Sequence, residues 1–449
     1  MRHSRTALMA ALLGFSSAAS AQGFDPVAAR AAIDKTLNQQ YPALDALYKD
    51  LHAHPELGFQ EIRTAALLAA RMRKLGFAVT EHVGKTGIVA VYRNGPGPVV
   101  MVRTELDGLP MEEKTGLPYA SKAQQTVDGK STYTDHACGH DIHMAWWVGA
   151  AEALVAMKDR WHGTLVFVGQ PAEEIVSGAK AMLDDGLFTK YPKPDYGFAA
   201  HVFPFPTGQV IVKQGVTTSA TDNFAITFKG IGSHGSTPDK GIDPVVQGAH
   251  FVADVQTVIS RRKDPQKYGV VTVGSFQAGT VANIIPDHAV LQMTLRSFDP
   301  AVRKLLMEGV TKTANAVASM ADAPAPEIKY LFGTGEVVND VALADKTAAM
   351  LKSALGDKAV MLVPAAVPGG NGSEDYSEFV AAGMPKSVFF AIGGYDPKTI
   401  AQYAAQNKPV PVNHSPLFAP VPEPTIRRGV EALALAVLSV TTDSASGKR

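Results

Sequence analysis

The spacing of apolar residues changes near residue 215 and again near residue 326. Before residue 215, segments with helical spacing alternate with short apolar runs that are typical of buried strands. The predicted helices cover residues 41–53, 64–75 and 142–157, and the predicted strands cover 87–92, 99–103, 163–169 and 196–202. Strands that alternate with helices predict an α/β fold, with helices on both faces of a sheet.

The segment between these two points has a different pattern. A strand at 224–229 alternates in polarity, as a strand with one buried face does, and two more strands and two helices follow it. These elements are predicted at 244–260 (helix), 270–276 and 289–298 (strands), and 301–320 (helix). We therefore predict that a compact α+β domain, residues 216–329, is inserted into a larger α/β domain made of residues 22–215 and 330–449.

Composition narrows the possible partners. The 449 residues suffice for two domains, and 46% of them are hydrophobic, as in a globular protein. The 42 basic residues balance the 42 acidic residues, so no net charge favours nucleic acid or an anionic membrane surface. A small molecule or a peptide is the expected substrate.

The first 21 residues have the pattern of a secretory signal peptide. A basic start at 1–5 precedes an apolar run at 7–15 and an Ala-Ser-Ala cleavage site at 19–21. A buried core helix is the alternative, but it would not explain the arginines or the small residues. The apolar run is too short to span a bilayer, and no later run is long enough. We therefore expect an exported protein, periplasmic or secreted, with no membrane span in the mature chain.

The only cysteine of the chain lies among histidines, in Thr-Asp-His-Ala-Cys-Gly-His-Asp-Ile-His at 134–143. A disulfide within the chain is excluded, which leaves an inert buried thiol, a nucleophile or a metal ligand. His136, Cys138 and His140 alternate, so an extended segment would direct all three to one side. Thiolate and imidazole are common ligands of zinc and related ions.

Three other segments supply further ligand types. Glu173 and Glu174 follow a predicted buried strand, where one carboxylate could bind metal and the other serve as a base; acidic residues at a helix N-terminus are the alternative. His201 ends another strand and His414 lies in a loop, and each alone is more typical of a structural histidine. Together, Cys138, His140, Glu174, His201 and His414 are too many ligands for one tetrahedral ion and suit two ions with a shared ligand.

Several motifs resemble those of the dinuclear metallo-aminoacylase family, which contains hippurate hydrolases, indole-acetyl-amino-acid hydrolases and related carboxypeptidases. They are His-Ala-His-Pro-Glu-Leu-Gly-Phe-Gln-Glu at 52–61, Leu-Asp-Gly-Leu-Pro-Met at 106–111, Thr-Gly-Leu-Pro-Tyr-Ala at 115–120, His-Ala-Cys-Gly-His-Asp at 136–141, the Glu173-Glu174 pair and Gly-Ser-Glu-Asp at 372–375. The resemblance implies a zinc-peptidase-like catalytic domain with a mixed central sheet. It also implies two divalent ions (zinc, manganese or cobalt) and an inserted ferredoxin-like lid through which two subunits form a homodimer.

The resemblance also implies roles for individual residues. Cys138, His140, Glu174, His201 and His414 would bind metal, and Glu173 would be the catalytic base. His234, in Gly-Ile-Gly-Ser-His at 230–234, would reach the substrate carbonyl, often across the dimer. Asn283 and Arg296 match lid positions that hold the substrate carboxylate, and Asp107 would orient a metal ligand. The chain departs from the family at Glu105, where relatives usually have aspartate, and in the small residues at 235–238.

The activity that we expect is hydrolysis of the amide bond in N-acyl amino acids or small peptides with a free carboxylate, by a metal-activated water. One alternative is a metal-free hydrolase in which Cys138 is the nucleophile and His140 or His136 the base. A second alternative is an exported protein that binds metal or peptide without catalysis.

Overall fold

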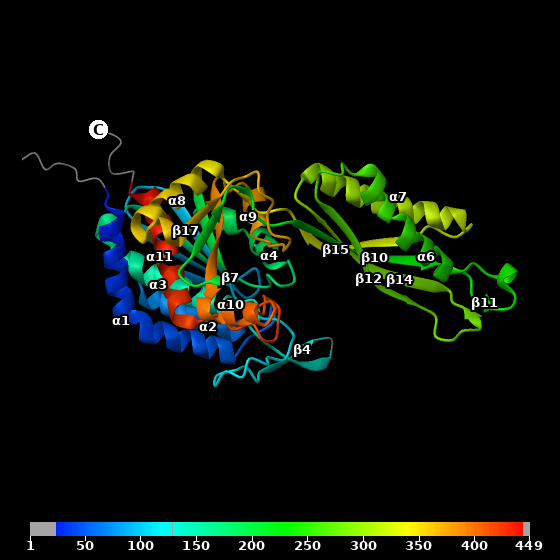
Figure 1. Cartoon of the computed structure of the whole chain (residues 1–449), viewed down its shortest axis with the longest axis horizontal. Coiled ribbons are helices and arrows are strands. Elements are labelled where there is room, and N and C mark those ends of the chain that lie inside the picture. The colour runs from blue at the N-terminus through cyan, green and yellow to red at the C-terminus, as the bar shows by residue number, and fades with distance from the viewer. Residues whose placement is uncertain (1–23, 128, 443–449) are drawn as a thin grey trace, which may run out of the picture.

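The computed structural model describes residues 24–127 and 129–442 and has two lobes (Figure 1). The predicted signal peptide, residues 1–21, lies outside the described residues. The larger lobe contains both ends of the described chain, and the smaller lobe, Ala220–Thr334, is called the inserted domain below. Within the described ranges, no helix is long and apolar enough to cross a membrane.

The larger lobe is built around a mixed eight-stranded sheet in the order β1-β2-β6-β3-β7-β18-β8-β17. Its strands are β1 (Ala78–Val83), β2 (Gly87–Asn94), β3 (Val99–Glu105), β6 (Gly163–Gln170), β7 (Tyr196–Pro206), β8 (Val210–Lys213), β17 (Val360–Val363) and β18 (Ser387–Tyr395). The four central strands β6, β3, β7 and β18 run parallel. All four are buried along most of their length, as is expected of a sheet that is covered on both faces.

Helices cover both faces of this sheet. One apolar core lies under α1 (Pro26–Ala53), α2 (Ile62–Lys74), α3 (His140–Ala156), α8 (Val341–Leu355) and α11 (Pro422–Thr441). A second core, on the opposite face, contains residues of α4 (Gly178–Asp184), α5 (Leu187–Lys190) and α9 (Ser377–Ala381). The fold therefore confirms the α/β class and the mixed central sheet flanked by helices. The helix α10 (Pro397–Ala405) has no fully buried residue.

Helix α1 is longer than the apolar spacing predicted. It begins at Pro26, where the Asp25 carboxylate accepts hydrogen bonds from the backbone N–H groups of Val27 and Ala28. It also continues through Pro42, so the predicted start at residue 41 was wrong. Helix α2 is followed by Gly76, whose φ of +90° is the left-handed conformation that commonly ends a helix.

The inserted domain is a four-stranded antiparallel sheet with two helices packed on one face. In chain order its elements are β10 (Ala220–Lys229), α6 (Pro244–Asp254), β12 (Gly269–Ala278), β14 (His288–Ser297), α7 (Pro300–Met320) and β15 (Glu327–Thr334). This βαββαβ order, with strands arranged β12-β14-β10-β15, is the ferredoxin-like arrangement. The predicted boundary at residue 329 falls inside β15, whose pairing with β10 continues to Thr334. The predicted helix 244–260 ends early, at Asp254, and a π-turn follows at Val258–Arg262.

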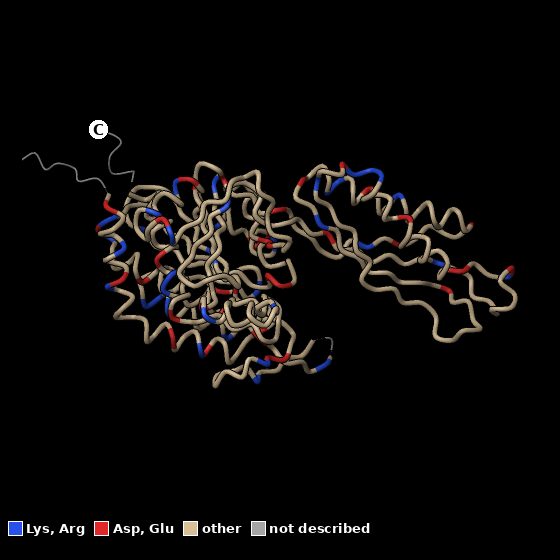
Figure 2. Tube along the Cα trace, in the orientation of Figure 1, with Lys and Arg blue, Asp and Glu red and all other residues tan. Residues whose placement is uncertain are grey.

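Short paired strands complete the fold, and charges are spread over both lobes. The pairs are β4 (Gln124–Val127) with β5 (Lys130–Tyr133), β9 (Gly215–Val216) with β16 (Val338–Asn339), and β11 (Ser233–His234) with β13 (Ile284–Ile285). Figure 2 shows basic and acidic residues interspersed along most of the chain. An exception is the segment 269–286 of the inserted domain, which contains no charged residue.

Candidate metal centre and active site

The segment around Cys138 is a tight turn that leads into α3. The Gly139 N–H donates to the His136 carbonyl, and α3 begins at His140. Gly139 has a φ of +87°, and a Cβ there would lie 2.4 Å from a Val202 methyl, so glycine is required. The predicted extended segment is therefore wrong, because the turn separates His136 from the other two side chains. The ring nitrogens of His136 are buried without a hydrogen bond to any described residue, and burial lowers the pKa of this imidazole to about 4.

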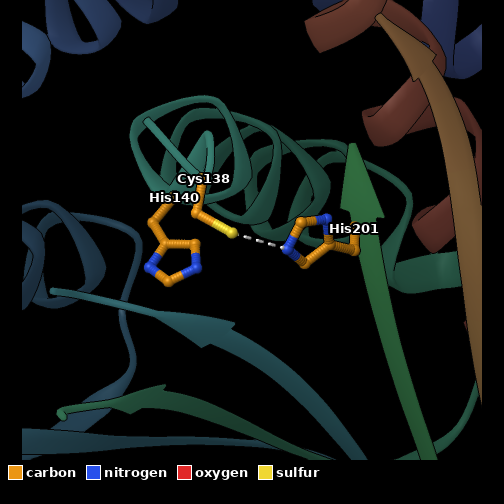
Figure 3. A group of neighbouring side chains, drawn as sticks. All are labelled: Cys138, His140 and His201. Atoms are coloured by element: carbon orange, nitrogen blue, oxygen red, sulfur yellow. Dashed lines mark hydrogen bonds between the residues drawn. The ribbon is translucent and has the colours of Figure 1, made fainter. Parts of the chain in front are cut away.

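Cys138 lies between two groups of potential ligands. Its Sγ lies 3.3 Å from His201 Nε2, and one ligand atom each from Cys138, His140 and His201 lie within 4.8 Å of one another (Figure 3). The same criterion groups Cys138 with Glu174 and His414. The structure thus brings all five predicted ligands together, and the thiol belongs to both sets.

Backbone carbonyls orient the two buried imidazoles of this centre. His140 Nδ1 lies 2.7 Å from the Asp107 carbonyl oxygen, and His201 Nδ1 lies 2.8 Å from that of Val202. With each Nδ1–H donated to a carbonyl, each Nε2 presents its lone pair to the centre, which is the tautomer a metal requires. Burial, and then His143, hold the pKa of His201 well below its ordinary value, so this imidazole is neutral.

Unpaired buried atoms mark the middle of the centre. Within the described chain, His140 Nε2 and Glu174 Oε1 have no hydrogen-bond partner and lie 3.8 Å apart. Burial opposes a charge on His140, but the Asp107 hydrogen bond and nearby carboxylates raise its pKa to about 10. Surroundings that attract a proton so strongly also attract a cation, so the donor set fits divalent ions. Asp107 contacts two of these residues: its carbonyl accepts from His140, and its Oδ2 accepts from the Glu174 N–H at 2.9 Å.

A loop holds His414 over the open side of the centre. His414 Nε2 lies 3.2 Å from Glu174 Oε2, and about half of its side chain is exposed. Its φ of +67° is unusual for a residue other than glycine, and its N–H donates to the Ala137 carbonyl at 2.8 Å. The Asn413 amide donates to the carbonyls of Cys138 and Val202, both at 3.1 Å. Sequence reasoning missed Asn413, which ties this loop to the segments that carry two other ligands.

Glu173 is buried next to the centre but is not at a helix start. It follows β6 within a short loop, and α4 begins only at Gly178, so the helix-terminus explanation of the Glu173-Glu174 pair does not apply. Its Oε2 lies 3.9 Å from His140 Nε2. Burial raises the pKa of Glu173 well above its ordinary value, and the carboxylates of Glu374 and Glu174 add to the effect. A carboxyl group of this kind takes up a proton readily.

A buried network of charges lies behind Glu173. Arg103, on β3, is fully buried and pairs with the carboxylates of Glu105, Glu374 (2.7 Å) and Asp375 (3.3 Å). Glu105 also lies 2.9 Å from His143 Nδ1, and His143 Nε2 accepts from the Val202 N–H. Sequence reasoning missed this network, although an arginine within a strand that is apolar on both faces is a signal, because a buried charge needs partners.

The centre opens into a cavity of about 460 Å³ between the two lobes. It is lined by Cys138, Glu173, Glu174, Val176, His201, Phe203, Thr218, Thr221, Asn223, Arg296, Phe332, Asn371, Gly372, Ser373, Glu374, Phe389, Asn413 and His414. The inserted domain contributes Thr221, Asn223, Arg296 and Phe332, and the other lining residues belong to the larger lobe. A substrate in this cavity would contact both lobes.

Of the three residues predicted to contact substrate from the inserted domain, only Arg296 lines this cavity. His234 lies on β11 and pairs with β13, and the Gly235 N–H donates to the Asn283 carbonyl. The β11–β13 pair lies at the outer end of the inserted domain, where Figure 1 labels β11. His234 is exposed there, and within the described chain its ring contacts Ser236.

Comparisons with known proteins agree with this geometry. The model of the family described as Peptidase family M20/M25/M40 matches residues 101–418. A hippurate hydrolase of Campylobacter jejuni is 37% identical over 310 residues, which cover 69% of this chain and 78% of the relative. Thermostable carboxypeptidase 1 of Saccharolobus solfataricus is 32% identical over 398 residues, which cover 87% and 93%.

Solved structures resemble the whole fold. A putative aminohydrolase from methicillin-resistant Staphylococcus aureus has a TM-score of 0.79 and 28% identity, with 92% of this chain and 100% of that chain covered. A Bacillus subtilis protein described as a dinuclear metal binding peptidase from M20 family has a TM-score of 0.67 and 28% identity, with 92% and 99% covered.

Proposed function

Because the chain belongs to peptidase family M20/M25/M40 and is a metal-dependent hydrolase of amide bonds, we propose that its substrates are N-acyl amino acids or small peptides with a free carboxylate. The observation that carries this proposal is the pair of ligand sets that share Cys138, with the carboxylate of Glu173 beside them.

We assign the two sets to two divalent ions per subunit. Cys138, His140 and His201 would hold one ion, and Cys138, Glu174 and His414 the other. Sulfur, nitrogen and oxygen donors together suit zinc, manganese or cobalt. When bound, such ions polarise the amide carbonyl and lower the pKa of water. A structural zinc site would instead be closed by four ligands and would have no use for a free carboxylate beside it.

Glu173 moves the proton in this mechanism. It takes a proton from the attacking water as the oxygen forms its bond to the amide carbon. It then delivers this proton to the nitrogen of the departing amine as the C–N bond breaks, so the carboxylate is regenerated. Asp107 and the Val202 carbonyl keep the imidazoles oriented throughout. Arg296 supplies a positive charge to the cavity, which favours substrates that end in a carboxylate.

The thiol environment argues against Cys138 as a nucleophile. Burial raises the pKa of this thiol well above its ordinary value, and the carboxylates of Glu174 and Glu173 add to the effect. A nucleophilic cysteine needs the opposite, a lowered pKa next to a cationic group. A protein that only binds metal or peptide would not need the protonatable Glu173 beside the ligands.

We also propose that the chain acts as an exported homodimer. The sequence of residues 1–21 supports export to the periplasm or beyond. The outer end of the inserted domain supports pairing, because it exposes apolar side chains next to His234 and Asn283. These exposed side chains are Ile231, Val245, Val246, Phe276, Val281 and Ile284. A partner subunit would cover them, and His234 would act in the partner's cavity.

A substrate panel tests the proposed function. The purified protein, supplied with zinc, manganese or cobalt, is assayed on N-benzoyl, N-acetyl and indole-acetyl amino acids and on dipeptides. We expect release of the free amino acid from at least one acyl series. No turnover of any of these amides with any of the three ions would refute the proposal.

A further inference from the structure

The cavity contains a guanidinium whose charge is not neutralised. Arg296 lies on β14, opposite Thr221 of β10, and is half-buried. Among the described residues, no carboxylate lies within ion-pair distance of it, and its hydrogen bond goes from Nη1 to the Ser373 hydroxyl at 2.7 Å. Burial lowers the pKa of Arg296, as expected where no acid compensates for lost water. A half-buried arginine without a carboxylate partner is suited to bind one from a ligand.

Ser373, which accepts the hydrogen bond from Arg296, lies in a loop whose backbone is held on both sides. The Ser219 N–H donates to the Gly372 carbonyl at 2.8 Å, which ties the loop to the start of the inserted domain. On the other side, Glu374 is paired with the fully buried Arg103. Ser373 lies between these two anchors, which hold its backbone within reach of Arg296.

From these contacts we propose that Ser373 is a positioning residue that determines specificity: it holds Arg296 ready for the substrate carboxylate. The inference rests on the proposed function. A neutral hydroxyl orients the guanidinium without consuming its charge, whereas a carboxylate at position 373 would neutralise it. One of the five N–H donors of Arg296 is used by Ser373, and the planar fork leaves a pair of donors for a bidentate contact.

The expected effect is on substrate binding. Without the hydroxyl, Arg296 must be ordered by the substrate itself, and ordering a long side chain or losing one hydrogen bond weakens binding about three- to tenfold. The chemical step does not involve Ser373, so kcat should change less than about twofold. A substrate with a carboxamide in place of the carboxylate has no charge for Arg296 to bind, so its KM should not depend on Ser373.

The test compares acid and amide substrates in matched variants. The metal-loaded wild type, Ser373→Ala, Ser373→Thr and the control Ser275→Ala, on the inserted-domain strand β12, are assayed with N-benzoylglycine, N-acetylmethionine and the carboxamide of each. Ser373→Ala should raise KM for the acids about three- to tenfold and leave KM for the carboxamides unchanged. Ser373→Thr keeps a hydroxyl and should retain wild-type KM values, as should Ser275→Ala.

A double-mutant comparison keeps the test valid if Ser373→Ala also disturbs the loop. In an Arg296→Gln background, Ser373→Ala should change KM for the acids less than about twofold, because its effect passes through Arg296. An equal rise in KM for acids and carboxamides, no change in KM for acids, or an undiminished effect in the Arg296→Gln background would each overturn the inference. If one of these results is obtained while the wild type hydrolyses the substrates, the inference on Ser373 is overturned but the proposed function is not. A wild type that hydrolyses no amide of the substrate panel described above would overturn the inference together with the function on which it rests.

Discussion

Two regions of the molecule differ in whether a single chain brings their functional side chains together. They are the metal-binding edge of the larger lobe and the outer end of the inserted domain. At the metal-binding edge, the proposed ligands from four separate segments converge, and backbone carbonyls orient the two buried imidazoles. At the outer end, His234 is exposed among apolar side chains and lies away from the cavity.

This difference follows from the surroundings of each region. Cys138, His140 and His201 are buried in the larger lobe, where a displaced polar group would cost free energy, and Asn413 ties the loop of His414 to this region. The outer end has the short β11–β13 pair, and Ile231, Val281 and Ile284 are exposed there. One chain therefore supplies all five proposed metal ligands, whereas the proposed use of His234 needs a second chain.

Removal of metal should have the largest effect of the changes considered, because it acts on the metal-binding edge directly. After dialysis against a chelator, the protein should lose its amidase activity, because the buried donor atoms then have no cation to bind. Addition of zinc, manganese or cobalt should restore it. Activity that survives metal depletion, verified by elemental analysis, and is abolished by a thiol-alkylating reagent would instead support Cys138 as a nucleophile.

Complementation tests whether the outer end acts in the partner's cavity. His234→Ala and Glu173→Gln should each lower kcat about a hundredfold or more, since one loses an oxyanion contact and the other the base. Co-expressed in one cell, the two variants should recover about a quarter of wild-type activity, because in a random two-fold dimer half of the dimers have one intact site. Active material should elute as a dimer. No recovery would show that His234 acts within its own chain or not at all.

A buried histidine far from the outer end should affect stability and not assembly. His52 Nδ1 lies 2.6 Å from Asp141, and its Nε2 lies 3.1 Å from Glu113. Burial opposes its charge, but the hydrogen bonds to these two carboxylates raise the pKa of His52 to about 10. His52→Gln leaves two buried carboxylates without a cation and should lower the free energy of unfolding by about 3–5 kcal/mol.

The pH dependence of this effect has a defined sign. Because the pKa of His52 is higher in the folded state than in the unfolded chain, its contribution is complete below pH 6.5 and is lost as the pH rises through about 10. Calorimetry at pH 6 and pH 10 should therefore show a large gap in Tm between wild type and His52→Gln at the lower pH and a smaller gap at the higher one. A gap that is constant with pH would mean that the imidazole is neutral in the folded protein.

The sequence predicted the elements of the fold better than the geometry of the site. Continuous apolar runs identified β2, β3, β6 and β7, and alternating polarity indicated the first strand of the inserted domain, because burial on two faces or on one produces these different patterns. The turn at Gly139 was missed, because spacing alone does not reveal a left-handed glycine. The contacts of Arg103, Asn413 and Ser373 were also missed, since each joins segments far apart in the chain. The start of α1 was missed because Pro42 normally indicates a break.

The metal content of Glu173→Gln tests the central claim most directly, because the claim assigns Glu173 to proton transfer and five other residues to metal. We expect elemental analysis of purified wild type and Glu173→Gln to give two divalent ions per chain in both, while the substitution lowers kcat about a hundredfold or more. A variant that loses its ions would make Glu173 a ligand, and a variant with near-normal turnover would remove it from the chemistry. Either result would contradict the account.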